Sequence, residues 1–254
     1  MTRVVIVRHG ETAENRDKIV QGQHPRLGRL TARGVHQAVW AGQALGAIPF
    51  DSAYCSDLER AVVTLGAILG ERRKAEPDEG TLTLRFAPEL REIHMGSMQG
   101  ATRAQWRALV GDNARDFVPP GGESWRDVHR RVTEYLDRVI RADGAKNLLV
   151  VAHAGVIRSL IAGWLGLPLE GVYRKPGDCL PQNNACINTL WLNPQGQVTA
   201  ARLNDTAHLA GHEEQKDPPL DWDPAERCFR RVREDGSPGE RVVWGDVSPD
   251  ADGD

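Results

Sequence analysis

The sequence predicts an α/β fold with a mostly parallel central sheet. Residues 4–7 (Val-Val-Ile-Val) and 148–152 (Leu-Leu-Val-Val-Ala) are uninterrupted apolar runs, which are typical of strands buried on both faces of a parallel sheet. Segments with the apolar spacing of helices lie between the strand-like segments of the chain. An alternation of strands with helices indicates parallel strands that are joined by helical crossovers.

The first third of the chain supplies two of these strands. After the strand at 4–7, residues 11–30 are polar and rich in Gly, Gln and Arg, which predicts a long ordered loop of a kind that often carries function. Thr31 can cap a helix that extends to about residue 45. We expect the second strand at 50–56, and Asp57 can cap the amphipathic helix that follows it.

The rest of the chain repeats this alternation. We expect strands at 82–86, 148–152, 185–192 and 198–203, and helices at 102–110, 124–141 and 156–165. Ser124, with Asp127 in the first turn, is a predicted helix start, and Gly166 is a predicted helix end. The Pro-Pro-Gly-Gly sequence at 119–122 breaks the chain, and residues 193–196 predict a turn between the last two strands.

We assign residues 1–212 to one domain and residues 213–254 to a C-terminal extension. The extension combines several prolines with many charges, and the composition of its acidic end is typical of disorder. Trp222, Phe229 and Trp244 are exceptions to this polar character. They predict that part of the extension packs on the domain, through a small strand near residues 241–244.

The composition is that of an ordinary globular protein, with 40% hydrophobic and 26% charged residues among 254. The formal net charge is −3, so the overall charge of the chain does not indicate nucleic acid or an anionic membrane as a partner. The apolar run at 4–7 is too short for a signal sequence or a membrane span, so we expect a cytoplasmic protein. A homo-oligomer is compatible with the sequence, which leaves the oligomeric state open.

We expect no metal site. The cysteines contain no Cys-x-x-Cys pair, which indicates free thiols at Cys55, Cys179, Cys186 and Cys228. His208 and His212 are spaced like a metal-binding pair on a helix, but surface histidines are the commoner meaning of this spacing.

Two of the predicted strands end in a histidine. His9 follows the strand at 4–7, and His153 follows the strand at 148–152. Ligands of parallel sheets bind at the carboxyl ends of the strands, so we expect both histidines at one cleft. Gly10 and Gly155 would let the backbone approach a bound group closely, and the helix after His153 would direct its first amides at an anion.

Two arginines and a glutamate complete this candidate site. Arg8 precedes His9, and Arg60 lies about one helical turn beyond the strand at 50–56. Guanidinium groups match phosphate oxygens, and their charge would lower the pKa of His9 and keep it neutral, as a nucleophile requires. Glu92 can supply the proton that a leaving alkoxide needs. Each residue alone is more often structural, and together they indicate an anion site.

Several segments of the chain resemble the histidine phosphatase superfamily, which includes the cofactor-dependent phosphoglycerate mutases. In order and spacing, the matching segments cover roughly residues 3–209 and comprise 5–12 with Asn15, 21–22, 30–38, 56–61 and 153–158. The resemblance implies a three-layer α/β/α sandwich with a mainly parallel sheet.

The resemblance also implies a role for each matching residue. His9 would carry a phosphohistidine, and Glu92 would act first as the general acid and then as the base that activates water. Arg8, Arg60 and His153 would bind the phosphoryl group, and Ala154 would contact the substrate or its phosphate. Asn15, Gln21 and Gly22 would line the substrate side of the pocket. The family needs no metal, and we expect no cofactor.

The residues around Glu92 favour one branch of this family. Mutases surround the acid with Glu-Arg-His-Tyr-Gly, whereas Ile93 and Met95 replace the Arg and Tyr here. This difference favours a metal-independent phosphatase that acts on a small-molecule phosphate ester. The alternatives are a bisphosphoglycerate-dependent mutase and, from another class, a catalytically inactive phosphate-binding or regulatory module. The ester itself stays open, and we expect Arg26 and Arg29 to be solvated.

Overall fold

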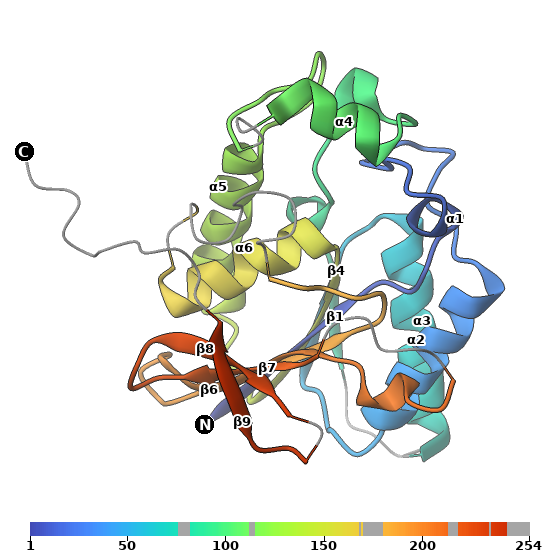
Figure 1. The fold of residues 1–254 in the computed structure, drawn as a ribbon. Coiled ribbons are helices and arrows are strands. Elements are labelled where there is room, and N and C mark those ends of the chain that lie inside the picture. The colour runs from blue at the N-terminus through green and yellow to red at the C-terminus, as the bar shows by residue number, and fades with distance from the viewer. Residues whose placement is uncertain are drawn as a thin grey trace, which may run out of the picture.

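The computed structural model describes residues 1–75, 82–111, 115–167, 169, 180–212, 218–233 and 235–242. These residues form one nine-stranded sheet in the order β3-β2-β4-β1-β5-β6-β7-β8-β9, with helices on both of its faces (Figure 1). The strands are β1 (Thr2–Arg8), β2 (Ser52–Cys55), β3 (Thr83–Phe86), β4 (Asn147–Ala152), β5 (Ile187–Leu192), β6 (Val198–Asp205), β7 (Leu220–Asp223), β8 (Cys228–Val232) and β9 (Pro238–Val242).

The helices follow the predicted order, with one addition inside the loop at 11–30. The α-helices are α1 (Ala13–Arg16), α2 (Ala32–Ala44), α3 (Glu59–Ala75), α4 (Arg103–Val110), α5 (Trp125–Tyr135) and α6 (Ala154–Leu165). Thr12 caps the added helix α1 in a reciprocal capping box with Asn15. The predicted helix at 124–141 begins at its Ser124 cap as α5 and then continues as the π-helical segment η4 (Leu136–Ile140).

The sheet is mixed, which corrects the expectation of a mainly parallel one. β3, β2, β4 and β1 are parallel neighbours, whereas every pairing from β1 to β5 and onward to β9 is antiparallel. The long apolar runs of β1 and β4 indicated buried parallel strands correctly, but the later strands follow one another directly and pair antiparallel. The α/β class is confirmed.

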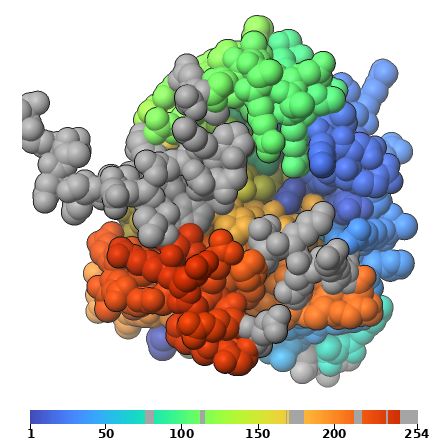
Figure 2. Space-filling model, viewed as in Figure 1, coloured from blue at the N-terminus to red at the C-terminus, as the bar shows by residue number. Residues whose placement is uncertain are grey.

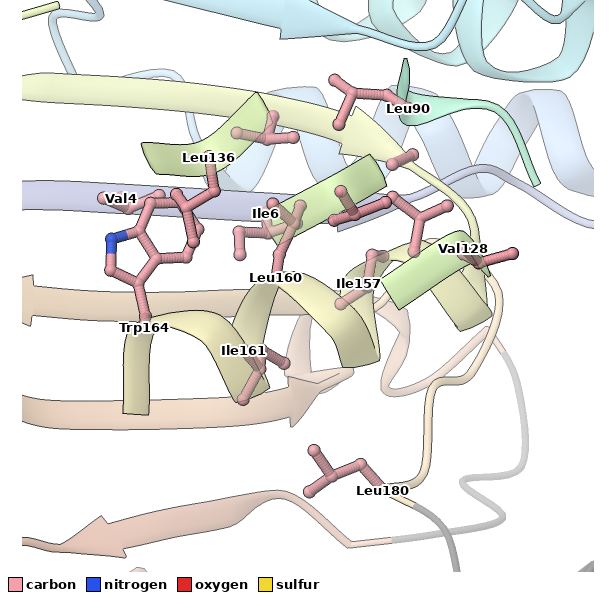
Figure 3. Close-up of a cluster of buried hydrophobic side chains, with 14 of the residues drawn as sticks. Val4, Ile6, Leu90, Val128, Leu136, Ile157, Leu160, Ile161, Trp164 and Leu180 are labelled. Atoms are coloured by element: carbon pink, nitrogen blue, oxygen red, sulfur yellow. The ribbon is translucent and has the colours of Figure 1, made fainter. Parts of the chain in front are cut away.

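Successive side chains of β1 enter two different hydrophobic clusters. Val4 and Ile6 pack in the cluster that includes α5 and α6, and Val5 and Val7 pack in the cluster that includes α2 and α3. Figure 3 shows the first cluster, where Leu160 of α6 lies beside Ile6. Two helical layers therefore enclose the central strands, which confirms the three-layer sandwich.

Part of the C-terminal extension continues the sheet. β7 pairs with β6, and β8 and β9 follow as further antiparallel strands. Trp222 and Phe229 are buried, with ring centroids 5.0 Å apart. The last strand, Pro238–Val242, includes the first two residues of the strand predicted near 241–244, and residues 243–254, with the acidic end, lie outside the described residues.

Three of the four cysteines lie in the described residues, and one of them belongs to a cluster with two carboxylates. Cys55, Cys186 and Cys228 are buried free thiols, and Cys179 lies outside the described residues. On the β7–β8 hairpin, Cys228 lies close to two carboxylates, but Arg230 already pairs with both of them at 3.3 and 2.6 Å. In the described part of the chain, no helix combines the length and apolar character needed to cross a membrane.

Candidate active site

The two histidines predicted to share a cleft are neighbours. β1 and β4 are adjacent and parallel, with Arg8 opposite Ala152, so the residues that follow them lie side by side. The ring centroids of His9 and His153 are 5.2 Å apart, and both side chains are buried. In the face shown in Figure 2, a hollow lies between the segment that includes α4 (green) and the N-terminal segment (blue), and α6 (olive) lies deeper.

The hydrogen bonding of His9 fixes which ring nitrogen carries its proton. Nδ1 of His9 lies 2.7 Å from the carbonyl oxygen of Gly10. A carbonyl only accepts hydrogen bonds, so Nδ1 donates and Nε2 keeps its lone pair. Burial, followed by the charges of Arg60 and Arg8, holds the pKa of His9 well below its usual 6.5. His9 is therefore neutral at physiological pH, with Nε2 as a free base.

Arg60 projects from the first turn of α3, directly beyond the end of β2. Its Nε donates to Nδ1 of His153 at 3.1 Å, and its Nη2 donates to the carbonyl oxygen of Gly22 at 3.0 Å. Burial lowers the pKa of Arg60 to about 10, which leaves it charged at neutral pH. Arg60 thus brings a buried positive charge next to both imidazoles.

Both ring nitrogens of His153 are engaged by the protein. Nδ1 accepts from Arg60, so Nε2 carries the proton and donates to Oγ of Ser56 at 2.8 Å. Burial and then the charge of Arg60 hold the pKa of His153 well below 6.5. In this arrangement His153 orients Arg60. For His153 to contact a phosphoryl group, as predicted, Nε2 must give up its hydrogen bond to Ser56 and donate to the phosphoryl group instead.

Arg8 supplies the second guanidinium. Its Nη1 donates to the carbonyl oxygen of Gln182 at 2.5 Å, whereas its Nε is buried and has no hydrogen-bond partner in the described structure. Burial lowers the pKa of Arg8 to about 10, so it also stays charged at neutral pH. A buried, charged donor without a partner is costly, and an anionic ligand would satisfy it.

Glu92 lies at the amino end of α6, the helix that begins directly after His153. Its Oε2 accepts from the amide of Gly155 at 3.4 Å, and its Oε1 accepts from the amide of Ile93 at 3.1 Å. A Cβ atom at Gly155 would lie 2.7 Å from Oε1 of Glu92 and 2.1 Å from the ring of Trp125. Glycine is therefore required at this position. Ala154 is the first residue of α6 and lies between His153 and this contact.

The three residues predicted to line the substrate side occupy different positions. The Asn15 side chain closes the α1 capping box and accepts from Nδ2 of Asn184 at 2.9 Å, so its bonds are structural. The backbone of Gly22 holds Arg60, at a positive φ of 53°. Gln21 is buried, and its Oε1 has no hydrogen-bond partner in the described structure. Of these three, Gln21 has a free side-chain acceptor.

The structure adds two arginines that the sequence argument did not select. The charges of Arg103 and Arg158 act on Arg8, and the side chain of Arg103 is exposed at the start of α4. Arg158 binds the carbonyl oxygen of Leu180 at 2.8 Å. Its position in the second turn of the helix after His153 was a usable signal, whereas no sequence pattern marks Arg103. Arg29, by contrast, has a side chain that is 84% exposed.

Comparison with known proteins assigns the family. The family model described as histidine phosphatase superfamily (branch 1) matches residues 4–206. This chain belongs to the histidine phosphatase superfamily.

The relatives of this chain in the histidine phosphatase superfamily include phosphatases and phosphoglycerate mutases. The adenosylcobalamin/alpha-ribazole phosphatase of Escherichia coli is 32% identical over 67% of this chain and 83% of that protein. A 2,3-bisphosphoglycerate-dependent phosphoglycerate mutase of Xanthobacter autotrophicus is 37% identical over 68% of this chain and 85% of that protein. The crystal structure of an alpha-ribazole phosphatase from Shigella flexneri matches 84% of this chain and all of that chain (100%), with a TM-score of 0.68 at 28% identity.

Because His9 and His153 are buried in neutral form, we expect the stability of this histidine phosphatase to decrease at acidic pH. In the unfolded chain each takes up a proton near pH 6.5, whereas in the folded protein both stay neutral to lower pH. The unfolded state then binds more protons, so stability is complete above pH 6.5 and falls as the pH drops below it. For each such histidine we expect the free energy of unfolding to fall by about 0.7 kcal/mol per pH unit at pH 6.5, and by up to about 1.4 kcal/mol per pH unit at lower pH.

Urea denaturation between about pH 7.5 and 5.5 measures this slope. His9→Gln removes one of the two buried imidazoles and should give a smaller slope than the unchanged protein. An identical slope in both proteins would contradict the prediction.

Proposed function

We propose that this chain is a metal-independent phosphatase that hydrolyses a small-molecule phosphate monoester through a phosphohistidine on His9. The observation that carries the proposal is the state of His9, a neutral imidazole with its Nδ1 proton held by Gly10 and two charged guanidiniums close by. This state leaves Nε2 as an unprotonated nucleophile inside a site built for an anion.

In the first step, Nε2 of His9 forms a bond to phosphorus as the ester P–O bond breaks. The Glu92 carboxyl group gives its proton to the leaving alkoxide, so that an alcohol departs. Arg8 and Arg60 stabilise the negative charge that spreads over the equatorial oxygens in the transition state. The products of this step are the alcohol, the phosphohistidine and the Glu92 carboxylate.

In the second step, the Glu92 carboxylate takes a proton from water as the water oxygen bonds to phosphorus. The P–N bond breaks, inorganic phosphate leaves, and neutral His9 is restored. Glu92 is protonated again and ready for the next ester. Both steps use only side chains of this chain.

Hydrolysis of p-nitrophenyl phosphate with a metal chelator present tests the proposal. We expect steady release of nitrophenol and of inorganic phosphate. A folded protein without turnover would favour an inactive binding module, and turnover that depends on an added metal would contradict the metal-independent mechanism.

Conversion of 3-phosphoglycerate with a bisphosphoglycerate primer tests the mutase alternative. Ile93 and Met95, which replace the polar residues of the mutase pattern, are buried in the hydrophobic core and offer the substrate no polar group. We therefore expect hydrolysis to exceed isomerisation. Faster isomerisation than hydrolysis would reverse this assignment.

We expect Arg103 to favour phosphate esters that carry a second anionic group. Its charge acts on Arg8, and it makes no hydrogen bond or ion pair with any side chain in the described structure. A charged hydrogen bond to a second anionic group of the substrate contributes about 1.5–3 kcal/mol, or at least about tenfold in affinity. We expect Arg103→Ala to raise KM about tenfold for an ester with a second carboxylate or phosphate, and much less for p-nitrophenyl phosphate.

Steady-state kinetics on a matched pair of esters, with and without the second anion, measures this preference. Arg26→Ala is the matched control, because Arg26 is an exposed arginine on the loop at 11–30. Equal changes in KM for both esters would show that Arg103 does not recognise a second anion.

A further inference from the structure

The reach of Glu92 depends on a backbone segment that has no regular structure of its own. Glu92 lies between two short 3-10 turns, η1 (Pro88–Leu90) and η2 (Gly96–Met98). Its carboxylate receives only two hydrogen bonds in the described structure, both from backbone amides and one of them long at 3.4 Å. Whatever fixes the backbone on either side of Glu92 therefore fixes the position of its carboxylate.

Arg131 of α5 binds this backbone segment directly. Its Nη1 donates to the carbonyl oxygen of Glu89 at 2.6 Å, and its Nη2 donates to that of Arg91 at 2.8 Å. A longer contact of 3.4 Å joins Nη2 to the carbonyl oxygen of Glu92 itself. One planar guanidinium thus holds three carbonyl groups, a geometry that the single ammonium of lysine cannot reproduce.

Glu123 forms an ion pair with Arg131. Its two carboxylate oxygens accept from Nη2 and Nε of Arg131 at 2.8 and 3.1 Å, and both side chains are mostly buried. The same carboxylate accepts from the amide of His94 at 2.8 Å, while the Glu123 amide donates to the His94 carbonyl at 2.9 Å. The ion pair therefore holds the chain both before and after Glu92.

A third side chain links the ion pair to the loop next to Arg60. Nε2 of Gln23 donates to the carbonyl oxygen of Glu92 at 2.8 Å and lies 3.5 Å from Oε1 of Glu123. The residue before Gln23 is Gly22, whose carbonyl holds Arg60. The segment that carries the proton donor is thereby tied to the segment that holds a phosphate-binding arginine.

We propose that the Arg131–Glu123 ion pair positions Glu92 for proton transfer, so that it controls departure of the alcohol and activation of water rather than binding of the phosphoryl group. Nε, Nη1 and Nη2 of Arg131 all bind protein atoms, which makes Arg131 and Glu123 positioning residues that act through Glu92. The inference rests on the proposed function, because it assumes Glu92 as acid and base.

Arg131→Gln and Glu123→Gln test the inference through the dependence on the leaving group. kcat/KM reports only the steps up to release of the alcohol. An alkoxide needs the proton of Glu92 to leave as the alcohol, whereas nitrophenolate leaves as the anion without it. We expect both variants to lower kcat/KM at least about tenfold for an alkyl phosphate and by less than about twofold for p-nitrophenyl phosphate. Inhibition by inorganic phosphate should stay unchanged.

Arg130→Gln is the matched control, because Arg130 is the neighbouring arginine of α5 and its side chain is 64% exposed. Combination with Glu92→Gln gives a second readout. If Arg131 acts through Glu92, Arg131→Gln should slow the Glu92→Gln protein little further. Thermal denaturation checks each fold, and the milder Glu123→Gln carries the test if Arg131→Gln does not fold.

Equal losses of kcat/KM on both esters, or losses that multiply with Glu92→Gln, would overturn the inference and leave the pair a structural role alone. Failure of the unchanged protein to hydrolyse either ester would instead refute the proposed function. The two failures are therefore distinguishable in one set of assays.

Discussion

His9→Ala removes turnover together with the acid-labile phosphoryl group on the protein. We expect kcat to fall by about 10⁴-fold or more, because no other group replaces a nucleophile in covalent catalysis. The physical basis is the fixed tautomer, in which Gly10 holds the Nδ1 proton and Nε2 keeps its lone pair. Rapid quenching with labelled substrate, followed by acid and alkaline treatment, measures the phosphohistidine.

The control for this prediction is His36→Ala, since His36 is an exposed histidine on α2. It should keep both turnover and labelling. Retained acid-labile phosphate on the His9→Ala protein would show that another nucleophile acts.

Glu92→Gln separates esters by the proton requirement of the leaving group. We expect kcat/KM to fall by about 10²–10⁴-fold for an alkyl phosphate, because an alkoxide leaves slowly without a proton. The same constant for p-nitrophenyl phosphate should change little, since nitrophenolate leaves unprotonated. Hydrolysis of the phosphohistidine should also slow, because the variant has no carboxylate to take a proton from water.

Stopped-flow release of nitrophenol measures both effects, and the Glu92→Gln protein should show a burst followed by a slow steady rate. Glu89→Gln is the matched control. Glu89 contacts Arg131 through its backbone carbonyl, which this substitution leaves in place. Equal slowing of both esters in kcat/KM would argue against Glu92 as the acid.

The candidate residues that follow predicted strands could be identified from the sequence. His9 and His153 follow apolar runs that are typical of buried strands, and the parallel pairing of β1 with β4 then places them side by side. Arg60 was found for the same reason, as the start of the helix after β2. Prediction succeeded here because strand ends in a parallel sheet share one edge.

The residues that position Glu92 had no such signal. Arg131 lies in the interior of a long helix and Glu123 lies beside a Pro-Gly break, so each looks like a surface charge in the sequence. Their meeting depends on how α5 packs beside η1. The same holds for Arg103, whose nearness to Arg8 follows from contacts between segments far apart in the chain.

The direction in which neighbouring strands of the mixed sheet pair was also not predictable from the sequence. A continuous apolar run predicts burial on both faces, which β1 and β4 show, but it does not specify which neighbour pairs antiparallel. The extension added three antiparallel strands because Trp222 and Phe229 find a buried position there.

Apolar period and local motif are properties of neighbouring residues, so the α/β class, the family and the residues at the strand ends could be predicted from the sequence. The tautomer of His9, the hydrogen bonds of both His153 nitrogens to Arg60 and Ser56, and the ion pair behind Glu92 depend on how distant segments pack. These features are set by distances of a few ångströms between segments that packing alone brings together.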